Sequence, residues 1–183
     1  MTIAEAQAEA RKVYLNGSVG QMVSGFIWLA SAALASWGTK RQAILVLVFG
    51  GMFIFPLTQL VLRVTGRPAS LSAGNPLRFL AMQVAFLVPL ILPVAGGAAL
   101  YNVNWFYPAC AVIVGAHYLP FVTLYGMWQY AVLAGVLVSG GIACGQVLPG
   151  AFAIGGWFTG GVLLLFGAWV AVWPKQGAVS GGA

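Results

Sequence analysis

His117 is the only histidine in the chain, and it lies beside Tyr118 inside a long apolar stretch, residues 104–130. An ionisable residue at membrane depth is costly to bury and therefore marks a candidate site. Its imidazole could shuttle a proton, bind a cofactor or hydrogen-bond a substrate. It could equally be a neutral ring bonded to a helix carbonyl that Pro120 or Pro56 leaves free. The functional and the structural interpretation both stay open.

Other polar side chains within the apolar runs could line the same site. They are uncharged, so they could bind a small neutral or weakly anionic solute through hydrogen bonds. Ser139 and Thr159 are weaker members of this set. The candidate substrate-binding residues are His117, Tyr118, Gln59, Gln83, Thr58 and Thr123.

The chain lacks the residues that most catalytic chemistry needs. Its two acidic residues, Glu5 and Glu9, both lie within the first ten positions. Paired-carboxylate acid–base catalysis, carboxylate metal sites and Asp/Glu proton relays are therefore excluded. Cys110 and Cys144 lie inside apolar runs without metal-ligand spacing, and no phosphate-binding loop is present. We expect no enzyme, no metal and no cofactor.

The composition indicates which solvent surrounds the chain. Hydrophobic residues make up 61% and charged residues only 5%, whereas a soluble domain carries roughly 25% charged residues. This small number of charged residues cannot cover a water-facing surface. Most of the surface must therefore face lipid. The net charge of +6 is spread in ones and twos at the ends of apolar runs, a pattern that fixes topology. We expect lipid, and no nucleic acid, as a partner.

Six apolar runs are long enough to cross a bilayer, which predicts an all-α polytopic membrane protein. The runs cover 19–37, 42–62, 79–100, 106–124, 129–144 and 151–173. Prolines interrupt the second, third and fourth runs, and broken helices at membrane depth typically line a cavity. Aromatic residues flank the fourth run on both sides, which is typical of interfacial anchors. They are Trp105, Phe106, Tyr107, Tyr125, Trp128 and Tyr130.

A short amphipathic helix precedes the spans, because Thr2 and Glu5 fit a capping box and polar and apolar residues alternate at helical spacing. The basic residues favour one side of the spans by six to two, which predicts that both termini are cytoplasmic. The chain then divides into an interfacial helix at 1–18, a six-helix transmembrane domain at 19–174 and a flexible tail at 175–183.

Two patterns concern packing. Gly51 and Pro56 in the second run match Gly115 and Pro120 in the fourth, which indicates either three repeated helical hairpins or a coincidence. Small residues four apart let helix backbones approach closely, either within one chain or between two copies in a homo-oligomer. The residues concerned are Gly141, Gly145, Gly156 and Gly160.

Several motifs resemble an uncharacterised family of small bacterial six-span integral membrane proteins. They are GGMFIFPLTQL at 50–60, GR at 66–67, GNPL at 74–77, and NWFYPA and HYLPFVTLYGM within 104–127. The resemblance implies a six-helix fold in a bacterial cytoplasmic (inner) membrane. It implies no activity and no functional residues.

Three functions follow from these observations. The leading hypothesis is a channel or transporter that passes a small neutral or weakly anionic solute through a polar site near His117. The alternative is a non-catalytic accessory or assembly subunit of a membrane complex or homo-oligomer. The third is a lipid or quinone binder.

Overall fold

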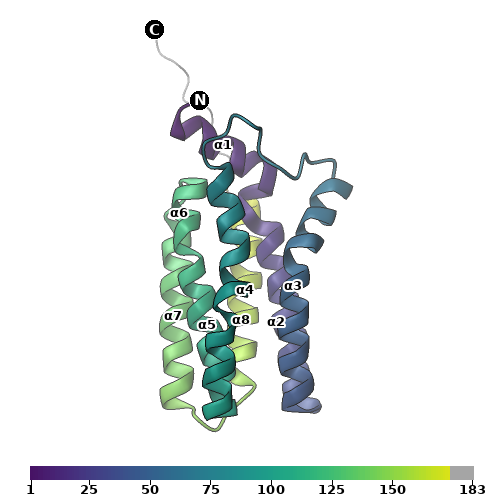
Figure 1. Ribbon diagram of the computed structural model, residues 1–183, viewed down its shortest axis with the longest axis vertical. Coiled ribbons are helices and arrows are strands. Elements are labelled where there is room, and N and C mark those ends of the chain that lie inside the picture. The colour runs from purple at the N-terminus through teal and green to yellow at the C-terminus, as the bar shows by residue number, and fades with distance from the viewer. Residues whose placement is uncertain (174–183) are drawn as a thin grey trace.

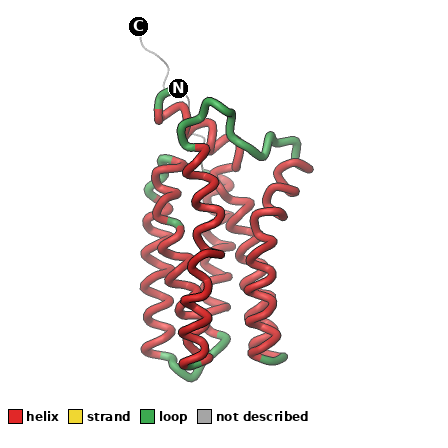
Figure 2. Tube along the Cα trace, in the orientation of Figure 1, coloured by secondary structure: helices red, strands yellow, loops and turns green. Residues whose placement is uncertain are grey.

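Helices account for nearly all of the chain that the computed structural model describes, residues 1–173 (Figure 2). No strand occurs in this part of the chain, so the all-α prediction is confirmed. The tail predicted at 175–183 lies outside the described residues. The elements are α1 (Ile3–Tyr14), η1 (Leu15–Gly17), α2 (Ser18–Trp37), α3 (Lys40–Val64), α4 (Arg78–Tyr101), η2 (Val103–Trp105), α5 (Phe106–His117), α6 (Leu119–Tyr125), α7 (Gln129–Val147) and α8 (Ile154–Val172).

Six helical segments in residues 1–173 are long and apolar enough to cross a membrane, and they run side by side (Figure 1). Each predicted run corresponds to one of them, so the six-span prediction is confirmed. Because lipid offers no hydrogen-bond partners, a spanning segment of this kind must pair its own backbone groups as a helix. The second span begins at Lys40, earlier than predicted, because the Thr39 side chain accepts from the Gln42 N–H (3.2 Å) and caps the helix there.

The helices divide into an interior group and two outer helices. α2 packs on α3 and α8, and α5 packs on α4 and α7. α3 touches α4 only slightly, and these two helices bury much less of their length than the other spans. Most of the largest fully buried side chains come from the interior group, and Leu62 at the end of α3 is the exception among them: Tyr107, Tyr130, Phe106, Leu62, Leu133, Leu137 and Leu163.

α1 lies across one end of the bundle, which we call the α1 end (Figure 1). Its capping box is formed: the Thr2 N–H donates to Glu5 Oε2 (2.7 Å) and the Glu5 N–H donates to Thr2 Oγ1 (3.3 Å). Ala6, Ala10 and Val13 are buried against the protein. The apolar face of this helix therefore packs on the bundle itself.

Gly17 makes the sharp connection between α1 and α2. Its φ of 80° lies in the left-handed region, and an added Cβ would lie 2.3 Å from the Tyr130 hydroxyl. Asn16, with φ 56°, is also left-handed, and its side-chain Nδ2 donates to the Val170 carbonyl (3.0 Å) of α8. The connection thus requires glycine for both conformation and space.

Glu9 ties α1 to the loop between α3 and α4. The Ser72 N–H donates to Glu9 Oε1 (2.7 Å), and Asn75 Nδ2 donates to Glu9 Oε2 (2.9 Å). The Ser72 N–H first, and then the Asn75 amide, hold the pKa of Glu9 below its ordinary value of 4.5. The stabilisation that these bonds give the folded protein is therefore fully present above pH 4.5. It is lost as the pH falls through the lowered pKa of Glu9.

Replacing Glu9 with alanine is expected to release this loop. Proteinase K, which cleaves exposed loops without requiring one residue type, should cleave the loop faster in Glu9→Ala than in wild type, because Ser72 and Asn75 lose their acceptor. Glu5→Ala removes the same charge from the same helix without touching the loop and should leave cleavage unchanged. In wild type, the protection of the loop amides from hydrogen exchange, relative to their intrinsic rate at each pH, should likewise fall in acid. Equal cleavage of the two variants would contradict this role for Glu9.

The prolines break fewer helices than predicted. Pro56 lies inside α3, and Pro89 and Pro93 lie inside α4, yet both helices continue through them. All three prolines are exposed, so their rings point away from packed neighbours. Only the fourth span divides, at Tyr118, because Pro120 stands in the first turn of α6. The prediction of broken helices is therefore wrong for the second and third spans.

The matching Gly/Pro patterns do not share an environment. An added Cβ at Gly51 would meet nothing within 4 Å, whereas at Gly115 it would lie 2.9 Å from the Val138 backbone nitrogen of α7. α3 is an outer helix and α5 an interior one. The similarity of the two segments does not extend to their packing.

Candidate functional site

A stripe of buried polar side chains follows the interior face of α2. Ser18, Gln21, Ser24 and Ser31 are each at most 5% exposed. Their spacing of three, three and seven residues places them on one side of the helix. The stripe starts at the α1 end and extends toward the opposite end of the bundle.

Three tyrosines face the first half of this stripe. Tyr118, Tyr125 and Tyr130 are all buried. The ring centroids of Tyr125 and Tyr130 lie 5.3 Å apart, those of Tyr118 and Tyr130 lie 6.0 Å apart, and Phe121 stacks on Tyr130 at 5.3 Å. Such contacts between rings stabilise a rigid cluster. We call Asn16, Gln21, Ser24, Tyr118, Tyr125 and Tyr130 the polar core.

Hydrogen bonds and ring contacts join the polar core across four elements. The Tyr130 hydroxyl donates to the Asn16 carbonyl (2.6 Å), and Gln21 Nε2 donates to the Tyr130 hydroxyl (3.2 Å). The Tyr118 ring packs against the Tyr130 ring with centroids 6.0 Å apart. These contacts connect η1, α2, α7 and the α5–α6 junction. Buried polar groups that are paired in this way fix how helices register against one another.

Some buried polar atoms have no partner among residues 1–173. They are Gln21 Oε1, Gln129 Oε1, Thr159 Oγ1 and His117 Nδ1. Burying an unpaired acceptor costs about 1–3 kcal/mol, so such atoms require an explanation. Gln21 Oε1 is the central one, because its side chain is 2% exposed and already belongs to the polar core.

A second polar contact lies further along the stripe. The Ser31 hydroxyl donates to the Ala43 carbonyl (2.8 Å) of α3 and pairs with the Tyr107 hydroxyl of α5. Tyr107 in turn packs against Phe152 with ring centroids 4.9 Å apart. Trp28, which is 2% exposed, stands on the same face between Ser24 and Ser31. The polar groups on α2 therefore extend into both halves of the bundle.

The structure brings together two of the six predicted site residues. His117 and Tyr118 lie at the α5–α6 junction, with the His117 ring 5.4 Å from Tyr118 and 5.1 Å from Phe121. Tyr118 belongs to the polar core, and His117 lies at its edge, partly buried. These two residues support a polar site in this region.

The other four predicted residues lie elsewhere. Gln83 is exposed on α4, and Gln59 is partly buried on α3. The Thr58 hydroxyl donates to the Ile54 carbonyl of its own helix (2.7 Å). Thr123 is exposed on α6, where its carbonyl accepts from Gln7 Nε2 (2.8 Å). Thr58 faces α2, since an added Cβ at Gly20 would lie 3.8 Å from its hydroxyl oxygen, whereas Gln83 points away from the bundle.

Sequence reasoning missed Gln21, Ser24 and Asn16. The signal was present, because Ser18, Gln21 and Ser24 recur every three residues within the first apolar run. A polar residue at that spacing in a span marks a face turned toward protein.

Four of the six predicted interfacial aromatics are core residues. Tyr107 and Tyr130 are 0% exposed, and Phe106 and Tyr125 are also buried. Trp105 and Trp128 are exposed. The prediction of aromatic anchors is wrong for the four buried residues, because each packs toward the bundle interior.

The four predicted packing glycines all face neighbouring helices of the same chain. An added Cβ would lie 3.0 Å from the Pro108 carbonyl oxygen at Gly141 and 3.2 Å from the Pro108 Cβ at Gly145. At Gly156 it would lie 2.9 Å from the Tyr107 ring, and at Gly160 3.1 Å from the Leu29 nitrogen. A homo-oligomer through these glycines stays a prediction.

The polar core offers hydrogen bonding to neutral groups. Its side chains are hydroxyls and amides, with the His117 ring 5.4 Å from Tyr118 and the Arg11 guanidinium bonded to the Tyr125 carbonyl. Within residues 1–173, no group of three or more metal-ligating side chains occurs. These groups can donate and accept hydrogen bonds without carrying a charge.

A six-span helical bundle with a buried polar interior defines a polytopic helical membrane protein. More particularly, the chain belongs to the family of unknown function DUF7010, whose model matches residues 3–172. This agrees with the resemblance to an uncharacterised family, and it assigns no activity. No curated protein and no solved structure matches the chain.

Proposed function

We propose that the protein passes a small neutral solute with N–H or O–H groups through its polar core. The observation that carries the proposal is Gln21 Oε1, a buried acceptor that has no donor among residues 1–173, on a polar stripe that extends into both halves of the bundle. A solute that donates a hydrogen bond would satisfy this atom.

The charge distribution supports a neutral solute over an anionic one. The interior spans α5, α7 and α8 contain no lysine or arginine, and α2 contains none either. Arg11 of α1 reaches the edge of the core, where its guanidinium is bonded to the Tyr125 carbonyl. Gln21 Oε1 and Gln129 Oε1 are acceptors only, so they repel an anion and attract a donor. Urea, glycerol and comparable molecules have the required groups.

The test is the swelling rate of proteoliposomes in gradients of urea, glycerol and sodium acetate. Wild type should admit a neutral solute faster than protein-free liposomes, with no such gain for acetate. Gln21→Leu should slow entry about tenfold, which corresponds to about 1.4 kcal/mol, the range of one hydrogen bond. His117→Ala, if it folds, tests whether the edge of the core contributes.

Gln83→Leu is the matched control, because it makes the same change at an exposed position on α4. It should pass solute at the wild-type rate. The proposal fails if wild type is no faster than empty liposomes for every solute. It also fails if Gln21→Leu and Gln83→Leu, both folded, slow entry equally.

We also propose that the protein resides in a bacterial cytoplasmic membrane with the α1 end inside. Five basic residues belong to elements of the α1 end: Arg11, Lys12, Arg63, Arg67 and Arg78. The opposite end carries Lys40 and Arg41, and positive residues favour the cytoplasmic side. Labelling of single cysteines in intact cells tests this, in a chain whose Cys110 and Cys144 are replaced by alanine. There Ser70→Cys should be protected from an impermeant reagent and Arg41→Cys should react.

A further inference from the structure

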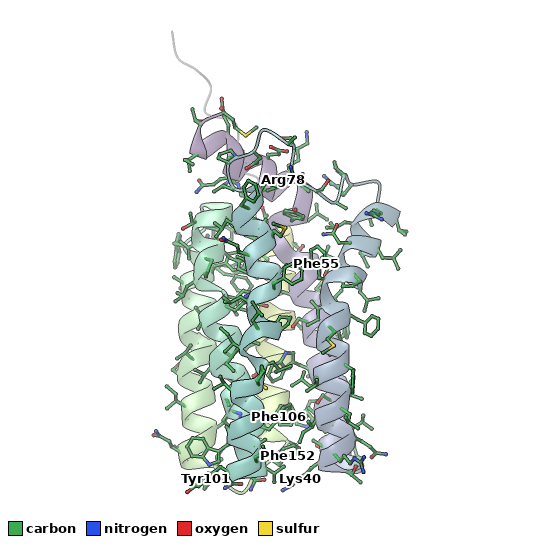
Figure 3. The ribbon with its side chains drawn as sticks, viewed as in Figure 1. Lys40, Phe55, Arg78, Tyr101, Phe106 and Phe152 are labelled. Atoms are coloured by element: carbon green, nitrogen blue, oxygen red, sulfur yellow. The ribbon has the colours of Figure 1, made fainter. Side chains whose placement is uncertain are left out.

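Two outer helices present unusually bare apolar faces. α3 packs on α2 and touches α4 only slightly, and the two outer helices diverge toward the α1 end (Figure 1). Phe55, which extends from α3 on the side of α4 in Figure 3, is 54% exposed. Phe79, Met82 and Phe86 on the first half of α4 are each more than half exposed. Neither helix covers the other at this end.

Exposed arginines stand where both faces reach the α1 end. Arg63 lies in the last turn of α3, and Arg78 is the first residue of α4 (Figure 3). Arg67, between them, donates to the Lys12 carbonyl (3.3 Å). Arg63 and Arg78 make no such bond within residues 1–173. A guanidinium group thus stands at the α1 end of each bare face, where lipid headgroups would lie.

Within residues 1–173, both carboxylate side chains already accept hydrogen bonds from groups other than these arginines. Glu9 is the acidic residue that contacts the loop, and it accepts from Ser72 and Asn75. Glu5 is held by the Thr2 N–H in the capping box. The charge at this end of α3 and α4 therefore favours an acidic partner.

We propose that an anionic phospholipid docks between α3 and α4, with its phosphate at Arg63 and Arg78 and its acyl chains along the bare apolar faces. Arginine binds phosphate through parallel N–H donors, and basic residues at the membrane surface attract anionic lipids. The aromatic and methionine side chains of both faces supply an apolar surface for the chains. This lipid site is separate from the polar core and does not depend on the proposed passage.

A second copy of the chain fits the same surface less well. In a symmetric dimer, both copies would expose the same end on the same side of the membrane. Arg63 and Arg78 of one copy would then lie at the level of the same arginines of its partner. Like charges at that level oppose association, whereas a phosphate neutralises them.

Native mass spectrometry of the purified full chain tests the proposal, with phosphatidylglycerol or phosphatidylcholine added. Wild type should retain phosphatidylglycerol in preference to phosphatidylcholine. Each basic residue near an anionic surface contributes about fivefold, so Arg63→Gln should weaken retention roughly fivefold and the double variant with Arg78→Gln roughly thirtyfold. Replacing both arginines with lysine should keep most of the preference, because the charge remains.

Arg41→Gln is the matched control, since it removes an exposed arginine from the first turn of α3 at the opposite end. It should leave phosphatidylglycerol retention unchanged. Equal retention of the two lipids by wild type would overturn the proposal without any variant. A loss in Arg41→Gln as large as in Arg63→Gln would overturn it too, since attraction would then follow overall charge. A lipid-free dimer would assign the surface to a second copy instead.

Discussion

Replacing Gly160 with leucine is expected to prevent α2 and α8 from packing and to leave little folded protein. An added Cβ at Gly160 would lie 3.1 Å from the backbone nitrogen of Leu29 and 2.7 Å from its side chain. The Leu29 side chain could rotate, but its backbone can retreat only if α2 moves. α2 and α8 share the most extensive helix contact in the described chain. Overpacking at such a site costs about 3 kcal/mol or more.

Gly161→Leu provides the control for this prediction. Gly161 is the next residue of α8, and an added Cβ there would meet nothing within 4 Å. The two variants have the same composition and differ only in the direction of the new side chain. Size-exclusion chromatography and thermal unfolding in detergent should show wild-type behaviour for Gly161→Leu and aggregation for Gly160→Leu. If both variants gave similar elution and unfolding profiles, α2 and α8 could move apart at Gly160 without loss of the fold, and the prediction would be wrong.

The sequence was sufficient to predict the six helices because one constraint determines them. Lipid leaves a spanning backbone no external partner, so each long apolar run must be helical. The starts of the helices were also accessible where a local signal exists, as with the Thr2 capping box. Proline was a weaker guide, because an exposed ring such as that of Pro56 can be accommodated within a continuous helix.

The direction in which each side chain points was harder to predict. Tyr130 and Trp128 are two residues apart at one end of a span, yet Tyr130 is 0% exposed and Trp128 is 64% exposed. Their residue types are similar, so only the packing of α7 against its neighbours separates a core ring from an interfacial one. The same limit explains why the exposed Gln83 was predicted as a site residue and the buried Gln21 was missed, although both lie within apolar runs.

The docking of α1 also depends on contacts between distant parts of the chain. Its alternating polar and apolar faces are typical of an interfacial helix. In the structure its polar residues reach the bundle, because Gln7 donates to the Thr123 carbonyl (2.8 Å) and Arg11 donates to the Tyr125 carbonyl. Nothing local to residues 3–14 specifies these acceptors, since both lie at the end of α6.

Tyr130→Phe is expected to destabilise the protein strongly although the ring is retained. The missing hydroxyl leaves the Asn16 carbonyl without its donor and Gln21 Nε2 without its acceptor. Each unpaired buried group costs about 1–3 kcal/mol, and the loss in thermal unfolding experiments should be about 2 kcal/mol. Tyr101→Phe removes the same hydroxyl from a side chain that is 91% exposed and should change stability very little. Equal effects would show that the polar core contributes no stability.

The double variant Gln21→Leu with Tyr130→Phe distinguishes a coupled network from two independent losses. Gln21→Leu alone removes the amide that donates to the Tyr130 hydroxyl. Tyr130→Phe alone leaves that amide in place without its acceptor. In the double variant the Gln21 amide is no longer present to be left unpaired. Its destabilisation should therefore be smaller than the sum of the two single effects, by about 0.5 kcal/mol or more. Strict additivity would place the cost of Tyr130→Phe at the Asn16 carbonyl alone and would separate Gln21 from the hydrogen-bonded core.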